Sequence, residues 1–144
     1  MIFNYWGLVL FISVMIPNTI YAVRCPEGFE NRWNNKIVQI IEQVGRYSCI
    51  VFMILIVPIF GADIPDGKYL AVYLSVDFLL VILYAVCWYK LWNRNDRFRA
   101  LALSIIPSLL FLFSGIMTRF ILLIAASLIF APAHITVSVK NSDK

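Results

Sequence analysis

Residues 100–139 read ALALSIIPSLLFLFSGIMTRFILLIAASLIFAPAHITVSV, an apolar stretch of 40 residues in which Arg119 is the one charged side chain. A single helix of this length would measure about 60 Å, roughly twice the hydrocarbon thickness of a bilayer. The stretch must therefore fold back on itself. Residues 114–119 (SGIMTR) predict the turn, because a glycine permits a tight turn and an arginine seeks the lipid headgroups. We expect two spans here, at about 99–115 and 119–139.

Three further apolar stretches precede this block, and each is long enough to cross a membrane, which takes about 20 residues. They cover about residues 2–23, 37–60 and 69–92. The sequence therefore predicts an all-α polytopic transmembrane helical bundle of five spans, forming a single domain over residues 1–144. An alternative with four spans keeps the last block as one helix with a long cytoplasmic extension.

The composition separates this chain from soluble proteins. Hydrophobic residues make up 62% and charged residues 14% of the chain, whereas soluble domains carry roughly 45–50% and about 25%. This excludes an ordinary soluble enzyme and a disulfide-stapled secreted module. The net charge of +4 rests on few charged residues, which do not provide the basic surface that a nucleic acid requires. The expected partner is the lipid bilayer, with a homo-oligomer or a larger membrane complex as the alternatives for assembly.

The distribution of cations predicts an orientation with the N-terminus outside and the C-terminus in the cytoplasm. This orientation places nine Lys and Arg residues in cytoplasmic segments and two, Lys68 and Arg119, in external turns, as the positive-inside rule requires. The nine are Arg24, Arg32, Lys36, Lys90, Arg94, Arg97, Arg99, Lys140 and Lys144. Four spans would move the C-terminal tail outside and weaken this asymmetry.

Ionisable side chains are costly inside a membrane and are therefore candidates for function. Glu42 and Arg46 lie four residues apart on one helical face, with Gln43 beside them. They predict either an ion pair that faces a buried polar cavity or an arginine that extends to the nearby interface.

Asp77 has no cation within four residues on its own predicted helix. It predicts either an ion or proton site, or a hydrogen bond to another helix that fixes the packing.

Two polar residues follow prolines within the spans, Asn18 after Pro17 and His134 after Pro132. With Pro107, these positions share the cytoplasmic half of the predicted bundle. Prolines kink helices, so kinks and polar groups at one depth predict a small cavity that opens towards the cytoplasm. Alternatively, each polar side chain satisfies a backbone carbonyl that a proline has freed. A histidine near a helix end commonly bonds a backbone group in this way.

No motif predicts a cofactor or a metal site. The chain lacks a glycine-rich phosphate loop, a His-Glu-x-x-His sequence and a nucleophile elbow. No pair of its three cysteines has the spacing of a redox or zinc site. The sequence therefore does not favour an enzyme, and we predict no catalytic residues.

At four places the sequence resembles a group of small, uncharacterised multipass membrane proteins of Gram-positive bacteria. These are Ile16-Pro17-Asn18, Glu42-Gln43-Val44-Gly45-Arg46, residues 99–108 (RALALSIIPS) and Ala131-Pro132-Ala133-His134. The resemblance covers most of the chain and implies a bacterial plasma membrane. The group offers no catalytic or binding residues to carry over.

Three functional hypotheses follow. The first is a protein that binds or conducts a small solute or ion, with candidate ligand- or ion-binding residues Asp77, Glu42, Arg46, Asn18, Gln43 and His134. The second is an accessory or regulatory subunit of a larger membrane complex, with Gly7, Gly45, Gly115 and Ala125-Ala126-Ser127 as close-packing positions. The third is an intramembrane lipid-modifying enzyme that uses Glu42, Arg46 and His134.

Overall fold

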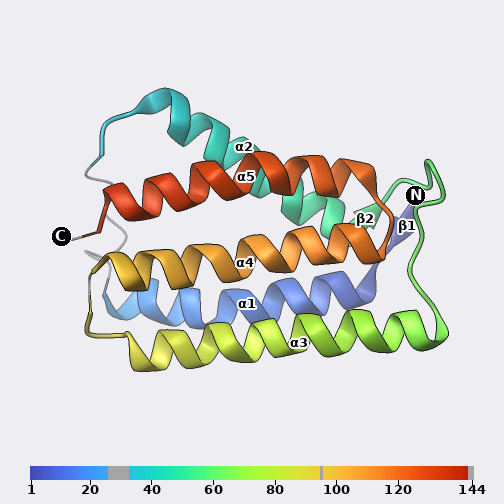
Figure 1. The fold of residues 1–144 in the computed structure, drawn as a ribbon, viewed down its shortest axis with the longest axis horizontal. Coiled ribbons are helices and arrows are strands. Elements are labelled where there is room, and N and C mark those ends of the chain that lie inside the picture. Colours follow the sequence, from blue (N-terminus) through green and yellow to red (C-terminus); the bar gives the residue numbers. More distant parts are fainter. Residues whose placement is uncertain (26–32, 95, 143–144) are drawn as a thin grey trace.

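The computed structural model describes residues 1–25, 33–94 and 96–142, and Figure 1 shows these residues as a bundle of long helices. The helices are α1 (Tyr5–Arg24), α2 (Lys36–Ile54), α3 (Gly67–Lys90), α4 (Arg97–Met117) and α5 (Ile121–Lys140). All five are long and apolar enough to cross a membrane. Large apolar side chains such as Ile12, Leu79 and Leu128 point outward, as lipid contact requires. The prediction of an all-α bundle with five spans is confirmed.

The 40-residue apolar block folds back on itself, as predicted, into α4 and α5. The turn lies later than expected, at residues 118–120, and Arg119 has the positive φ of 54°. Gly115 remains inside α4, and a Cβ added to it would lie 2.9 Å from Ile124 Cγ1. The prediction that this glycine makes the turn is therefore wrong: it lets α4 and α5 approach each other.

Each helix contacts its neighbours around the bundle in the order α2, α5, α4, α3 and α1, and α1 also contacts α2. Figure 1 shows α4 and α5 side by side, while α2 runs obliquely and its first half stands away from the rest. Two glycines permit close contacts of α2. A Cβ on Gly45 would lie 2.9 Å from Phe130 Cα in α5, and one on Gly7 in α1 would lie 2.1 Å from the carbonyl oxygen of Met53.

The second span is shorter than the apolar stretch 37–60 predicts, because α2 ends at Ile54. Leu55–Ile56 forms β2, which pairs antiparallel with β1, Ile2–Phe3. Pro58 explains the early end, since a proline disfavours helical geometry in the residue before it and has no N–H to donate. The first span likewise begins at Tyr5 rather than at Ile2, since Ile2 belongs to the strand.

Asn4 connects three helices at this end of the bundle. Its side-chain oxygen accepts a hydrogen bond from the Gly7 N–H and so caps α1. Its amide nitrogen donates to the Met53 carbonyl at 3.2 Å and to the Tyr73 hydroxyl at 3.3 Å. Asn4 and Tyr73 are both buried, so these hydrogen bonds lie inside the bundle.

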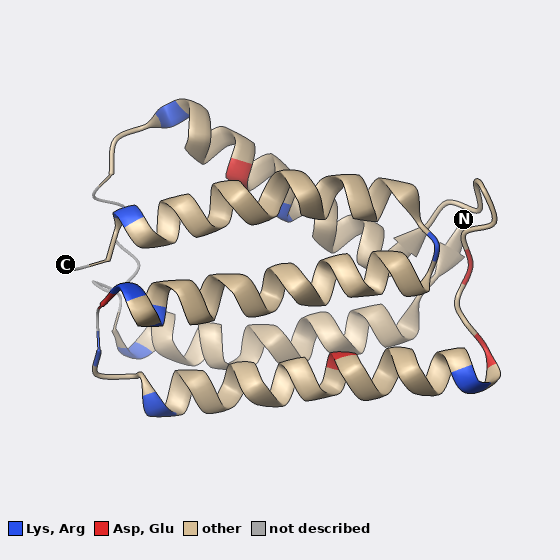
Figure 2. Cartoon of the chain, in the orientation of Figure 1, with Lys and Arg blue, Asp and Glu red and all other residues tan. Residues whose placement is uncertain are grey.

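The helices alternate in direction, so their charged ends collect at one end of the bundle (Figure 2). We call this the cationic end, and it is marked by Arg24, Lys36, Lys90, Arg97 and Lys140, which begin or end the five helices. The opposite end carries Lys68 and Arg119 with Asp63 and Asp66. Among the described residues the charge separation is the one the sequence predicts, while Arg32 and Lys144 lie outside the described residues. The direction of the bundle in a membrane stays a prediction.

Candidate functional site

A cavity of about 750 Å³ lies in the half of the bundle near the cationic end. All five helices contribute to its wall. Five of the six candidate residues line it: Asn18, Glu42, Gln43, Arg46 and His134. The structure thus brings together residues from α1, α2 and α5 that the sequence separates by more than 100 positions.

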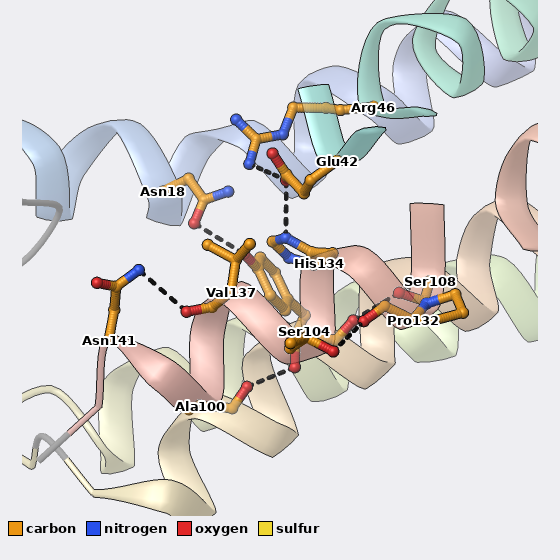
Figure 3. Close-up of polar contacts among 12 residues, drawn as sticks. Asn18, Glu42, Arg46, Ala100, Ser104, Ser108, Pro132, His134, Val137 and Asn141 are labelled. Atoms are coloured by element: carbon orange, nitrogen blue, oxygen red, sulfur yellow. Dashed lines mark hydrogen bonds and ion pairs between the residues drawn. The ribbon is translucent and has the colours of Figure 1, made fainter. Parts of the chain in front are cut away.

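Glu42, Arg46 and His134 form the central polar contact of the wall (Figure 3). The Arg46 guanidinium donates to Glu42 Oε1 one helical turn away, and His134 Nδ1 lies 3.0 Å from the same oxygen. The Glu42 side chain is 5% exposed and that of Arg46 is 44% exposed. Because an ionised carboxylate only accepts hydrogen bonds, His134 must carry its proton on Nδ1 when Glu42 is charged.

His134 is held by a second contact, since its ring stacks on Phe130 with 4.6 Å between centroids. It therefore binds a carboxylate on another helix, not the backbone group that its position near a helix end suggested. The arrangement ties α2 to α5 at the depth of the cavity. Gly45 permits it, because the close approach to Phe130 brings Glu42 within reach of His134.

In the same cavity wall, Asn18 accepts a hydrogen bond of 2.7 Å from the Tyr84 hydroxyl. This bond joins α1 to α3. Gln43 lines the cavity from an exposed position on α2.

The prolines contribute less than predicted. Pro107 lines the cavity, whereas Pro17 and Pro132 do not. Hydroxyls of the helix interior bond nearby carbonyls, as with Ser108 and Ser104 in α4. Of the three prolines, Pro107 alone thus belongs to the described residues of the cavity wall.

Arg99 also lines the cavity, although its position in the sequence predicts only a cation near the membrane surface. It is 8% exposed. Its guanidinium carbon lies 4.5 Å from the centroid of the Tyr21 ring and 5.2 Å from that of a Trp88 ring, within cation–π range. One sequence signal points to this placement: Arg99 shares a helical face with Leu103, Pro107 and Leu110, which also line the cavity.

Asp77, the sixth candidate, lies outside the cavity. It is fully buried between α3 and α4, where Ser114 Oγ donates a 2.6 Å hydrogen bond to its Oδ2. Its Oδ1 has no hydrogen-bond partner among the residues that the structure describes. The geometry is the hydrogen bond to another helix that the sequence offered as one of two alternatives.

Comparisons of the chain with protein-family models, with curated proteins and with solved structures found no match.

Proposed function

We propose that this chain is an integral membrane protein that binds a small solute in the cavity near its cationic end. The observation that carries the proposal is the convergence of Asn18, Glu42, Arg46 and His134 on one cavity at the depth of the spans. Polar groups at that depth are costly and are commonly retained for function. The volume of about 750 Å³ falls in the range of roughly 300–1,000 Å³ typical of small-molecule sites.

By the positive-inside rule we assign the cationic end, and with it the cavity, to the cytoplasmic side. The other half of the bundle is filled by side chains that are at most 1% exposed, namely Leu10, Met53, Tyr73, Phe120 and Leu123. Conduction across the membrane would need a second arrangement of these residues. Binding is therefore the role that the geometry supports best.

The accessory-subunit hypothesis has less support. Three of its candidate packing positions, Gly7, Gly45 and Gly115, are in close contact with other helices of the same chain. Of the Ala125-Ala126-Ser127 patch, Ala126 and Ser127 are buried and Ala125 is exposed, so few of these positions are available to a partner protein.

The test is a purification in mild neutral detergent, followed by native mass spectrometry of retained small molecules. Ala100→Trp introduces a large ring into the cavity wall. Ala85→Trp is the matched control, because Ala85 is exposed on the outer face of α3. We expect the wild type and Ala85→Trp to retain the same molecule and Ala100→Trp to lose it. Equal retention by both variants, or no retained molecule in the wild type, would contradict the proposal.

A further inference from the structure

The cavity wall carries an excess of positive charge. Among the described residues that line it, the charged groups are Arg46, Arg99 and Glu42. The charge of Glu42 is matched by Arg46, with which it forms an ion pair. No described carboxylate forms an ion pair with Arg99. A negatively charged guest is therefore favoured over a neutral or positive one.

Arg99 is fixed in place but has donors to spare. Two aromatic faces, those of Tyr21 and Trp88, hold its guanidinium, and one of its N–H groups donates to the Arg94 carbonyl. A guanidinium carries five N–H donors, two of which can bind a carboxylate or a phosphate side by side. Because the side chain is already held by its neighbours, binding an anion costs little further ordering.

Farther from the cationic end, the same cavity becomes apolar. Its wall there consists of Phe11, Val14, Ile50, Leu110, Phe111 and Phe130. The cavity also reaches the flank of the bundle between α1 and α2, where its lining residues Met15 and Tyr47 are exposed. A guest with an apolar chain can thus enter from the bilayer and still place a charged head near Arg99.

We infer that the ligand is an amphipathic anion, with a carboxylate or phosphate head bound by Arg99 and an apolar chain in the deep part of the cavity. This inference rests on the proposed function, whose ligand it specifies. The same chemistry is offered by an anionic membrane lipid and by a water-soluble amphiphile. The head group is recognised identically in both.

The probe is decanoate, titrated by calorimetry into the full chain in nanodiscs of phosphatidylcholine, with empty nanodiscs subtracted. We expect saturable binding, and Arg99→Gln is expected to weaken it by about tenfold or more, as for a lost charge-assisted hydrogen bond. Arg97→Gln is the matched control, because Arg97 is exposed at the same end and does not line the cavity. Decyltrimethylammonium, which has the same chain and the opposite charge, is expected to show no saturable binding.

Arg99→Lys provides a second variant in case Arg99→Gln does not fold. It keeps the charge and loses the planar fork, so its affinity is expected to lie between those of the wild type and Arg99→Gln. Wild-type affinity in Arg99→Lys, equal effects of Arg99→Gln and Arg97→Gln, or equal binding of the cationic probe would each overturn the inference.

A second titration, in nanodiscs that contain phosphatidylglycerol, distinguishes an anionic membrane lipid from a water-soluble amphiphile as the ligand. A loss of decanoate affinity identifies an anionic lipid as the competing occupant, and an unchanged affinity identifies the soluble amphiphile; either supports the anionic class. If decanoate does not bind saturably while Ala100→Trp still removes a retained molecule, the ligand class is wrong and the binding role stands. If both measurements are negative, both proposals fail.

Discussion

At the level of single side chains, Asp77 and Ser114 form a polar contact between α3 and α4 in which both residues are fully buried. Ser114→Ala removes the hydrogen bond that the carboxyl accepts. We expect it to lower the free energy of unfolding by about 1–2 kcal/mol, since a buried polar group then lacks a partner. Unfolding of the purified protein in mixed micelles with increasing sodium dodecyl sulfate measures this change.

Ser108→Ala is the matched control on the same helix, because within the described part of the chain the Ser108 hydroxyl bonds only the Ser104 carbonyl of its own helix. It should lower the free energy of unfolding much less than Ser114→Ala does. Asp77→Asn keeps an acceptor for Ser114 and should unfold much as the wild type does. Equal losses in the two serine variants would show that the contact between the helices contributes nothing.

His134 Nδ1 in α5 lies 3.0 Å from Glu42 Oε1 in α2. His134→Phe preserves the stack on Phe130 but removes the donor, and Glu42→Gln removes the carboxylate. In a double-mutant cycle we expect a coupling of about 0.5–3 kcal/mol in the free energy of unfolding. A cycle between His134→Phe and Gln43→Ala should give a coupling near zero. Comparable couplings in both cycles would contradict the assigned contact.

At the level of helix pairs, Gly45 controls the approach of α2 to α5. A Cβ at this position would lie 2.9 Å from Phe130 Cα and 3.0 Å from Phe130 Cβ, so Gly45→Ala must push the helices apart. We expect a loss of about 1–3 kcal/mol in the free energy of unfolding. Val44→Leu also enlarges a side chain of α2, but Val44 is exposed, and its effect should be small. If Gly45→Ala and Val44→Leu had the same free energy of unfolding, close packing of α2 on α5 at Gly45 would be ruled out.

The first turn of α4 depends on Asp96. Its carboxylate accepts hydrogen bonds from the Arg99 backbone N–H and from the Arg94 side chain. Chiefly because of the backbone bond, the pKa of Asp96 is lowered from its ordinary value. The folded turn therefore favours the ionised form. Its stabilisation is complete above the ordinary pKa of an aspartate and is lost as the pH falls through the lowered pKa.

We therefore expect protection of the Arg99 and Ala100 amides from hydrogen exchange, corrected for the intrinsic pH dependence of exchange, to fall in strongly acidic solution. Asp96→Asn is the control, because asparagine also caps helices but does not titrate. In Asp96→Asn, the protection of these amides should not fall in strongly acidic solution. The same loss of protection in Asp96→Asn would show that another group causes the pH dependence.

At the level of the whole molecule, the number of spans could be predicted from the lengths of the apolar stretches. A 40-residue apolar block cannot cross a bilayer once, and this argument alone separates α4 from α5. Length alone did not predict the end of α2, because Leu55 and Ile56 are apolar enough to extend the span, although Pro58 is a local signal for it. They leave the helix to pair with Ile2 and Phe3, and that partner is distant in the sequence.

The candidate site could be predicted in part. Asn18, Glu42, Arg46 and His134 lie at similar depths in their predicted spans, and they line one cavity. This follows because helices that alternate in direction place residues of equal depth side by side. Depth alone did not identify Arg99, whose position is set by Tyr21 and Trp88 on two other helices. It also could not exclude Asp77, since which helical face meets α4 is decided by packing rather than by spacing.

The bundle holds a cavity inside its spans near the cationic end, and we expect water to reach it from that end. The most direct test is labelling of introduced cysteines with a membrane-impermeant thiol reagent, after replacement of Cys25, Cys49 and Cys87 by alanine. Leu103 in α4 lines the cavity, and Leu83 in α3 faces outward at a similar distance from the cationic end. We predict that Leu103→Cys reacts from the cationic side and that Leu83→Cys does not. Equal reactivity at the two positions, or none at Leu103→Cys, would contradict the account.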